Sequence, residues 1–454
     1  VAPRVTGHTR GYPRRDRLRK GMTMLYKNLD INALGHLTIA GIDACDLARE
    51  FGTPLYVLDE ERVRENCRTY VEAMKAYMPA GSRPLYAGKA LCFKGVYPVV
   101  QSEGLGADVV STGEIACALA AGFPAEDLYF HGTNKSDADL EFAMDRGVGT
   151  LVVDNLNELH ALNSLAGVRG VVQDILLRVT VGLDPHTLEA INTGKVDSQF
   201  GVPIDTGQAM RFLREALTCS NLHIAGFHSH IGSQIFEADS FIDQIDRLLA
   251  FAIAAKDELG FTAEVFNLGG GFGVRYVEAD PRVDIAGNIQ TIAGHLNTGC
   301  EAAGYPLPRV LMEPGRSIVA DAGVTLYTTG GVKTVEGYRD YVTVDGGMTD
   351  NPRYALYKSA YTILNASHAD APADFICTIA GRCCESGDRV AENIAIARPE
   401  RGDIIAVLTT GAYNFAMASN YNRIGRPALV MLAGGKARLA VRRQTAEDLL
   451  ALEL

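Results

Sequence analysis

The sequence predicts an α/β protein with two parts, a (β/α)8 TIM-type barrel and an antiparallel β domain of barrel-like or sandwich-like form. Eight short apolar or β-branched runs alternate with helix-like stretches over about 250 residues, which is the number of units in such a barrel. After residue 317 the sequence changes to Gly-rich, β-branched segments, which are typical of antiparallel strands. We expect an N-terminal segment to join this second domain.

The expected boundaries divide the chain into four segments. Residues 1–24 are a basic disordered arm or a non-native extension, because seven arginines and lysines there accompany the single acid Asp16 without apolar periodicity. Met22 or Met24 is then a candidate native start. Residues 25–57 contribute to the β domain, residues 58–317 form the barrel, and residues 318–454 complete the β domain.

Composition limits the classes of function. With 454 residues, 47% apolar and 21% charged, the chain has the profile of a folded, soluble two-domain protein. Its formal net charge of -11 disfavours binding to nucleic acids. The apolar runs are short and no signal-peptide pattern is present, so we expect a cytoplasmic enzyme without a membrane span. Nine cysteines without C-x-x-C spacing argue against a disulfide framework and a zinc site, and we expect no metal.

The elements follow in order along the chain. Strand-like runs at residues 36–39 and 54–58 flank a short helical segment at residues 45–51. The eight barrel strands are expected at residues 84–87, 107–110, 128–130, 150–153, 175–181, 223–230, 265–268 and 310–312. The helix-like stretches are residues 60–77, 113–121, 137–146, 157–165, 207–217, 241–259 and 287–303. Such alternation predicts a parallel sheet.

Polar residues recur directly after the barrel strands. Enzymes of this fold carry their chemistry at the carboxyl ends of the strands. The polar residues found there are Lys89, Asp108 with Ser111, His131 with Asn134, Asp154, Arg178, His230 with Ser233, Gly269 to Gly271, and Glu313 to Arg316. Any one of them could be structural, but their recurrence at one rim indicates an active site.

Lys89 is the candidate nucleophile, because an apolar strand-like run ends on it between two small residues. A partly desolvated lysine gives up its proton readily and forms a Schiff base with a carbonyl compound. A surface lysine at a strand end is the alternative interpretation.

Two glycine turns are suited to a phosphate. The run Gly269-Gly-Gly-Phe-Gly273 can take positive φ and expose backbone N–H groups, and Gly315 can do the same. The G-x-G-x-x-G pattern of a dinucleotide site fails, because Val274 stands at its sixth position. A tight strand-to-helix turn is the alternative for the glycines.

A phosphate site after late strands and a Schiff-base lysine after an early one predict pyridoxal 5'-phosphate as the cofactor. Glu313 would then face the ring nitrogen and keep it protonated. His230 could stack on the ring face, and Ser233 could reach the phosphate.

The C-terminal region supplies strands and polar loops. Strands are expected at residues 324–328, 341–345, 375–379, 403–408, 428–432 and 437–441. The polar clusters are Asn351-Pro-Arg353 with Tyr357, the run from Cys383 to Asp388, and the run from Gly411 to Phe415. Ordinary loop chemistry is the alternative for each.

Five motifs occur in a fixed order from about Leu34 to the C-terminus. They are Tyr86-Ala-Gly-Lys-Ala90, His228-Ser-His-Ile-Gly-Ser-Gln234, Gly269-Gly-Gly-Phe-Gly273, Glu313-Pro-Gly-Arg-Ser317 and Cys384-Glu-Ser-Gly-Asp388. Together they resemble diaminopimelate decarboxylase, a family of barrel-type, fold type III pyridoxal-phosphate decarboxylases.

The resemblance implies a role for each matching residue. Lys89 would hold the cofactor and Cys384 would donate a proton, and these two are the implied catalytic residues. The implied cofactor-binding set is Lys89, Asp108, His230, Ser233, Gly270, Gly271, Glu313, Gly315, Arg316 and Tyr413. The implied substrate-binding set is Arg316, Arg353, Tyr357, Glu385 and Tyr413.

The sequence departs from the family pattern at two places. The family segment Arg-Pro-Ala-Leu-Tyr reads Arg353-Tyr-Ala-Leu-Tyr357 here, but the spacing of four between Arg and Tyr is kept. Cys383 precedes Cys384 and makes the identity of the working thiol ambiguous. We choose Cys384 because it stands directly before Glu385-Ser-Gly-Asp388.

The implied reaction is the decarboxylation of meso-2,6-diaminopimelate to L-lysine and CO2, the last step of lysine biosynthesis. Two arginines suit a substrate that retains a carboxylate, and Glu385 suits its distal ammonium. The alternatives are a related decarboxylase acting on ornithine, arginine or carboxynorspermidine, an amino-acid racemase, and a non-catalytic pyridoxal-phosphate carrier. Arg316 with Arg353 disfavours the diamine precursors, and the full β domain disfavours the carrier.

The resemblance also implies a homodimer with shared active sites. Each site would take Lys89 from one protomer and Cys384 with Glu385 from the other, and two-fold symmetry would make two such sites.

Overall fold

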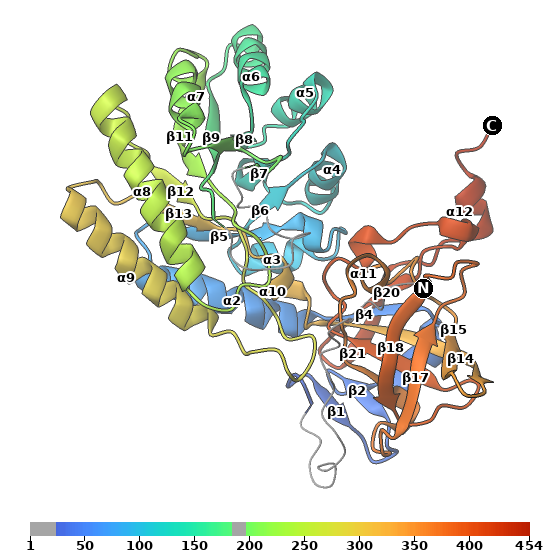
Figure 1. Cartoon of the computed structure of the whole chain (residues 1–454). Helices are drawn as coiled ribbons and strands as arrows, with labels where there is room; N and C mark the ends of the chain where they lie inside the picture. The colour runs from blue at the N-terminus through green and yellow to red at the C-terminus, as the bar shows by residue number, and fades with distance from the viewer. Residues whose placement is uncertain (1–23, 184–196) are drawn as a thin grey trace, which may run out of the picture.

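The protein is described by a computed structural model that covers residues 24–183 and 197–454. The expected arm at residues 1–24 therefore lies almost entirely outside the described residues. Figure 1 shows two parts side by side, a barrel surrounded by helices and a β domain.

The first part is a closed parallel barrel, as predicted. Its strands are β5 (Arg83–Ala87), β6 (Gly106–Val109), β7 (Leu128–Phe130), β8 (Thr150–Val153), β9 (Gln173–Thr180), β11 (Leu222–His228), β12 (Val265–Asn267) and β13 (Arg309–Met312). Every neighbouring pair is parallel, and the pairings of β8 with β9 and of β13 with β5 close the circle. The two-residue strand β10 (Val202–Pro203) is added beside β9.

Helices cover the outside of the barrel, and most begin where the sequence predicts. They are α2 (Glu60–Tyr77), α3 (Tyr97–Ser102), α4 (Thr112–Ala120), α5 (Asp137–Asp145), α6 (Leu156–Arg169), α7 (Gln208–Ala216), α8 (Asp239–Leu259), α9 (Ile285–Ala303) and the short α10 (Arg316–Val319). The side chains of Asp59, Ser111 and Asn155 accept hydrogen bonds from the first backbone N–H groups of α2, α4 and α6. Such caps fix where each helix starts.

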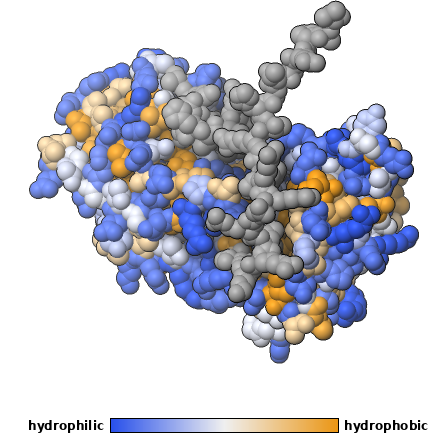
Figure 2. All heavy atoms as spheres, turned by 60° about the horizontal axis from the view of Figure 1, so that its bottom comes forward, coloured by the Kyte–Doolittle hydropathy of each residue, from blue (hydrophilic) through white to orange (hydrophobic). Residues whose placement is uncertain are grey.

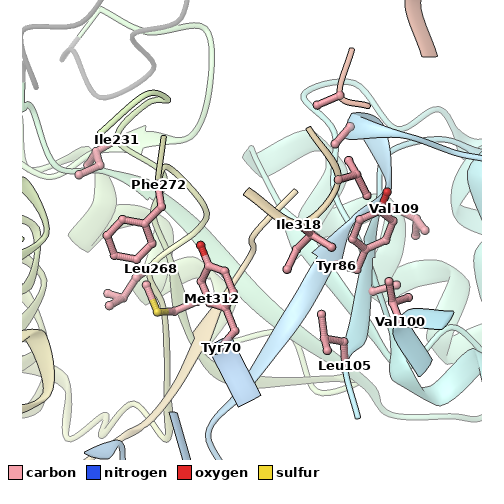
Figure 3. Packing of buried hydrophobic residues seen from close by; sticks show 14 of the residues in the cluster. Tyr70, Tyr86, Val100, Leu105, Val109, Ile231, Leu268, Phe272, Met312 and Ile318 are labelled. Carbon is pink, nitrogen blue, oxygen red and sulfur yellow. The ribbon is translucent and has the colours of Figure 1, made fainter. Parts of the chain in front are cut away.

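The inside of the barrel is a small apolar core. Seven strands contribute one buried side chain each to it, namely Leu85, Tyr129, Val152, Leu176, Ala225, Val265 and Leu311. A larger core lies between the strands and the surrounding helices. In Figure 3, Tyr86 of β5 lies near Val100, Leu105 and Val109, and Phe272 lies beside Leu268. The barrel is therefore filled, and its rim is free to carry the chemistry.

The second part is built on a sheet that also contains an N-terminal strand. Its strands are β4 (Leu55–Asp59), β14 (Gly323–Val335), β15 (Arg339–Val344), β16 (Ile363–Asn365), β17 (Phe375–Ala380), β18 (Arg389–Ile396), β19 (Ile404–Leu408), β20 (Ala428–Ala433) and β21 (Lys436–Val441). Most pairs are antiparallel, but β4 with β20 and β15 with β17 are parallel, so the sheet is mixed rather than purely antiparallel. Two short helices, α11 (Arg353–Tyr357) and α12 (Ala446–Leu450), complete this part.

Strand β4 shows that the sheet is covered on both faces. All five of its residues are buried. Leu55 and Val57 join the core under the N-terminal segment, whereas Tyr56 and Leu58 join the core that continues to the barrel. The N-terminal segment itself holds a three-stranded sheet, β1 (Leu29–Ile31), β2 (Leu37–Ile39) and β3 (Ile42–Asp43), and helix α1 (Ala44–Phe51).

Hydrophilic residues predominate on the face that Figure 2 shows, and apolar residues lie among them in small groups. Among the described residues, none of the helices combines the length and the apolar character that crossing a bilayer requires.

Candidate active site

A cavity of about 470 Å³ opens at the carboxyl ends of the barrel strands. Its volume lies in the range of roughly 300–1,000 Å³ that small-molecule sites occupy. Strand ends from around the barrel supply its lining, which includes Lys89, His131, Arg178, His228, His230 and Glu313. Of the polar residues that the sequence placed at the rim, the lining contains Lys89, Ser111, His131, Asn134, Arg178, His230 and Glu313, whereas Asp108, Asp154, Ser233, Gly269 to Gly271, Gly315 and Arg316 lie outside it.

Lys89 lies in a short 3-10 turn (Gly88–Ala90) directly after β5, and its side chain is open to the cavity. Burial inside the rim disfavours the ammonium, but the interactions with Asp108, Tyr413 and Glu313 outweigh this and raise the pKa of Lys89 above its usual value. This environment therefore does not support the expectation of an amine that loses its proton readily. The turn is held by the backbone N–H of Tyr413, which donates to the carbonyl of Ala90 at 2.8 Å.

Glu313 follows β13 and is buried at 5% exposure with three polar neighbours. Asn267 Nδ2 donates to Oε1 at 2.7 Å, His131 Nε2 lies 2.9 Å from Oε1, and His228 Nε2 lies 3.2 Å from Oε2. Burial disfavours the carboxylate, but the two histidines outweigh it and hold the pKa of Glu313 well below its usual value. Glu313 is therefore an anion at the cavity wall.

Asp108, at the end of β6, has the opposite environment. It is almost fully buried, its Oδ1 is 3.7 Å from His131 Nε2, and this oxygen has no hydrogen-bond donor among the described residues. Burial raises the pKa of Asp108, although His131 and Lys89 oppose the shift. Asp108 lies beside the cavity as a charge partner of Lys89.

The glycine turn after β12 makes a cradle with the loop after β11. Gly269 has a φ of +66°, and at Gly270 a Cβ atom would overlap the Glu313 carbonyl oxygen. Ile235 N donates to Gly271 O at 3.0 Å, which ties the two loops together. In the part of the chain that the structure describes, the backbone N–H groups of Gly270, Gly271 and Gly315 have no acceptor.

Arg316, Arg353, Tyr357 and Tyr413 lie together. The guanidinium carbon of Arg316 is 4.8 Å from the centre of the Tyr413 ring, and that of Arg353 is 5.5 Å from the same centre. Arg353 also lies 5.3 Å from the centre of the Tyr357 ring. Two charged side chains that are distant in the sequence are thus brought to one aromatic ring.

Arg316 is also linked to the cradle. Its Nε and Nη2 each donate to Ser233 Oγ at 3.0 Å, and its Nη1 donates to Tyr276 OH at 2.6 Å. Ser233 therefore contacts the predicted substrate arginine as well as standing beside the glycine cradle. Tyr276 was not among the residues expected from the sequence.

The loop of residues 383–388 in the β domain is not part of the cavity lining. Asp388 is buried and accepts hydrogen bonds from Met348 N and Cys383 N, both at 2.7 Å. Cys384 and Glu385 are exposed. The structure of one chain therefore does not bring these two residues to Lys89.

Some of the rim residues have local structural partners. Ser111 caps α4, and Asp154 Oδ1 accepts a hydrogen bond from Gly201 N at 2.9 Å. From the sequence, His131 was expected only as a strand-end residue and His228 only as part of a motif. Asn267 was not expected at the site. The signal for Asn267 was its place at a strand end, two residues before Gly269.

The arrangement fits pyridoxal phosphate at three points. Lys89 can reach an aldehyde in the cavity, the anionic Glu313 can face a ring nitrogen, and the cradle offers unused N–H groups to a phosphate.

Comparisons with known proteins agree with this chemistry. The pyridoxal-dependent decarboxylase, pyridoxal binding domain family matches residues 60–320. A diaminopimelate decarboxylase of Bacillus subtilis (strain 168) is 42% identical over 93% of this chain and 96% of its own length. One of Mycobacterium tuberculosis (strain H37Rv) is 40% identical over 94% of this chain and 97% of its own length.

Solved structures agree as well. The crystal structure of a diaminopimelate decarboxylase from M. jannaschii superposes with a TM-score of 0.88 at 31% identity, covering 94% of this chain and 98% of the other. A lysine/ornithine decarboxylase from Vibrio vulnificus, complexed with putrescine, superposes with a TM-score of 0.71 at 25% identity over 85% of this chain and 96% of the other. The chain belongs to the diaminopimelate decarboxylase family of pyridoxal-dependent decarboxylases.

Proposed function

We propose that this chain uses pyridoxal phosphate to decarboxylate meso-2,6-diaminopimelate to L-lysine and CO2. The observation that carries the proposal is the pair of guanidinium groups of Arg316 and Arg353 beside the Tyr413 ring. A guanidinium binds a carboxylate bidentately, so a paired site suits a substrate that keeps one carboxylate after the other is lost. The names of the curated relatives support the same substrate.

The cofactor residues have defined tasks. Bound pyridoxal phosphate supplies an electron sink for the electrons that the departing carboxylate leaves behind. Lys89 would hold its aldehyde carbon, and Glu313 would keep a proton on its ring nitrogen. Gly270, Gly271, Gly315 and Ser233 bind the phosphate.

Within this proposal, Asp108 balances the charge of Lys89, and His230 lies against the ring. His230 lines the cavity, and burial with the neighbouring Lys89 lowers its pKa well below the usual value. A neutral imidazole can pack on an electron-poor ring without adding charge.

The substrate residues act at the other end of the site. Arg353 keeps its Nε without a hydrogen-bond partner among the described residues, although the side chain is buried, so it has a donor to offer. Arg316, Arg353 and Tyr357 bind the distal carboxylate, and Tyr413 serves both cofactor and substrate.

We also propose a homodimer in which Cys384 and Glu385 come from the partner subunit. Both residues are exposed in the single chain, and neither lines the cavity that holds Lys89. Glu385 would bind the distal ammonium and Cys384 would donate a proton to the α-carbon. The enzyme would work in the cytoplasm as the last step of lysine biosynthesis.

The direct test is product identification by mass after incubation with a panel of amino acids. The panel holds meso-diaminopimelate, lysine, ornithine, arginine and carboxynorspermidine, with pyridoxal phosphate present. We expect lysine from diaminopimelate as the main product. Faster decarboxylation of lysine or ornithine would replace the proposal with the activity named for the Vibrio vulnificus structure.

A further inference from the structure

We propose that His131, His228 and Asn267 are positioning residues that hold Glu313 as a carboxylate with an acceptor site on Oε2 left for the cofactor. The inference rests on the proposed function, since it assigns Glu313 to the ring nitrogen. It concerns three residues on three different strand ends, after β7, at the end of β11 and at the end of β12.

The three neighbours occupy defined parts of the carboxylate. Oε1 has two of them: Asn267 Nδ2 donates to it at 2.7 Å, and His131 Nε2 lies 2.9 Å away as an ionic contact without hydrogen-bond geometry. Oε2 has one, His228 Nε2 at 3.2 Å. A carboxylate offers about four lone-pair sites, so one site on Oε2 stays open. Because Glu313 lines the cavity, that site is available to a donor there.

The orientation of Asn267 is fixed at both ends. Its Nδ2 donates to Glu313, and its Oδ1 accepts from Gly269 N at 3.0 Å. Asn267 is fully buried, so neither group can exchange its partner for bulk water. This amide couples the position of the carboxylate to the glycine cradle.

His228 is a neutral donor. Burial lowers its pKa to about 3, so its ring carries one proton at pH 7. Nε2 faces Glu313, whereas the buried Nδ1 has no partner among the described residues, and the proton therefore belongs on Nε2. A neutral donor at His228 holds the anion in place without cancelling the charge that a protonated ring nitrogen needs.

The same groups distinguish Glu313 from Asp108. His131 Nε2 is 2.9 Å from Glu313 but 3.7 Å from Asp108, beyond hydrogen-bond distance. All three neighbours thus serve Glu313, and the described residues give Asp108 Oδ1 no donor. The arrangement selects which of two buried carboxylates faces the cofactor ring.

The experiment compares His228→Leu, which removes the donor, with His228→Gln, which keeps an N–H group. The first readout is the dissociation constant of pyridoxal phosphate, from the visible absorbance of the apoprotein during titration. The second is the split between kcat and KM for diaminopimelate. Thermal unfolding of each variant checks the fold, and His160→Leu, at an exposed histidine of α6, is the matched control.

For His228→Leu we expect pyridoxal phosphate to bind about ten- to a hundredfold more weakly, the effect of losing one hydrogen bond to a charged group. The value of kcat falls and KM changes little. His228→Gln restores most of both losses, and His160→Leu behaves as wild type. His131→Leu and Asn267→Leu should act in the same direction.

Two outcomes would overturn the inference. One is wild-type cofactor affinity in a folded His228→Leu protein, or a folded His228→Gln protein as weak as the leucine variant. The other concerns metal, since the ligand atoms of His131, His228 and Glu313 lie within 4.8 Å of one another. A stoichiometric metal ion in the purified wild type, lost in His228→Gln, would give these residues a different task. Failure of the wild type to take up pyridoxal phosphate or release lysine would instead refute the proposed function.

Discussion

The barrel rim and the 383–388 loop are built in opposite ways. At the rim, Glu313 and Arg316 are each 5% exposed, and their polar atoms contact named partners. In the loop, Cys384 and Glu385 are exposed, and only Asp388 is buried. The rim is organised within one chain, whereas the loop turns its reactive groups outward. The difference teaches that burial alone cannot test the two residues that the proposed dimer would add to this site.

Replacing Lys89 removes the centre of the rim and has the largest expected effect. Lys89→Ala should lose both the visible absorbance of the bound cofactor and turnover, because Lys135, the other described lysine that lines the cavity, has its amine engaged by Glu158 and by the carbonyls of Gly132 and Val152. Absorbance spectra measure the bound cofactor, and product assays measure turnover. Lys94→Ala, an exposed lysine five residues later, is the control. An unchanged spectrum and activity in Lys89→Ala would contradict the cofactor assignment.

The role of the 383–388 loop is tested by replacing its two cysteines, Cys383 and Cys384. Cys384→Ala should lower kcat by roughly 10²–10⁴, the usual contribution of a general acid, with little change in KM. Cys383→Ala should keep most activity, because Cys383 is partly buried and burial beside Asp388 raises its pKa to about 11. Steady-state kinetics of both variants show which thiol is the proton donor. A large loss of kcat in Cys383→Ala with little loss in Cys384→Ala would make Cys383 the proton donor.

Arg353 tests the substrate end of the site. Arg353→Ala should weaken diaminopimelate binding by on the order of 2 kcal/mol, roughly thirtyfold in KM, through loss of a charge-assisted contact. The cofactor spectrum should stay the same. Arg316→Ala should change both substrate binding and the cofactor spectrum, because Arg316 also donates a hydrogen bond to Ser233. Arg401→Ala, at an exposed arginine, is the control; a KM for Arg353→Ala equal to that of the control would remove Arg353 from the substrate site.

Mixing two inactive variants asks whether rim and loop come from different chains. In a Lys89→Ala and Cys384→Ala heterodimer, one shared site collects both lesions and the other collects neither. Random exchange makes about half the dimers mixed, so activity should recover to about a quarter of wild type. Differently tagged protomers verify the exchange. Recovery near zero after verified exchange would show that each site is built within one chain.

The smallest expected effect concerns Glu114, a carboxyl group that is buried behind the rim and whose burial lowers the free energy of unfolding. Burial raises the pKa of Glu114 to about 8, against 4.5 for the free side chain. The folded state keeps the Glu114 proton between these values while the unfolded state loses it, so the contribution of Glu114 to stability falls as pH rises from about 4.5 to 8 and changes no further above.

The glutamine of Glu114→Gln cannot ionise. The free energy of unfolding of this variant should therefore rise relative to that of wild type across the window, by at most ~1.4 kcal/mol per pH unit. Chemical denaturation at several pH values measures the difference. Glu72→Gln, at an exposed glutamate of α2, should show no such trend. A pH-independent difference for Glu114→Gln would mean that the carboxyl ionises alike in both states.

The fold was predictable where local pattern determines it. The eight barrel strands alternate with helices whose caps stand in the sequence, so their order followed directly. Strands β16 and β18 were missed, because β16 has three residues and β18 is interrupted at Asn393, which has a φ of +55°. The parallel pairing of β4 with β20 is a contact between distant segments that no local pattern encodes.

The site was predictable to the level of strand ends. Parallel strands bring their carboxyl ends to one rim, which grouped Lys89 and Glu313 without a structure. The donors to Glu313 depend on side-chain directions instead. His228 and His230 stand two residues apart, and spacing alone did not tell which of them reaches the carboxylate.

The departure at Tyr354 also became clear only in three dimensions. Its hydroxyl donates to Glu392 of β18 at 2.8 Å, which anchors α11, the helix that begins with Arg353. A tyrosine at this position therefore tethers the helix that carries Arg353, the proposed substrate arginine.

The place of β4 has a consequence for how the chain is made. Val57 pairs with Val324 on one side and Val430 on the other, so the barrel is an insertion between the first strand of the β domain and the rest of it. During synthesis, β4 leaves the ribosome before the barrel does. Its two neighbours, β14 and β20, are both available only after the whole barrel and most of the C-terminal region have been made. Because domains generally fold as units during synthesis, the barrel is complete before the β domain can close. A C-terminal fragment that lacks β4 would leave β14 and β20 with facing unpaired edges, which is a site for association with other chains.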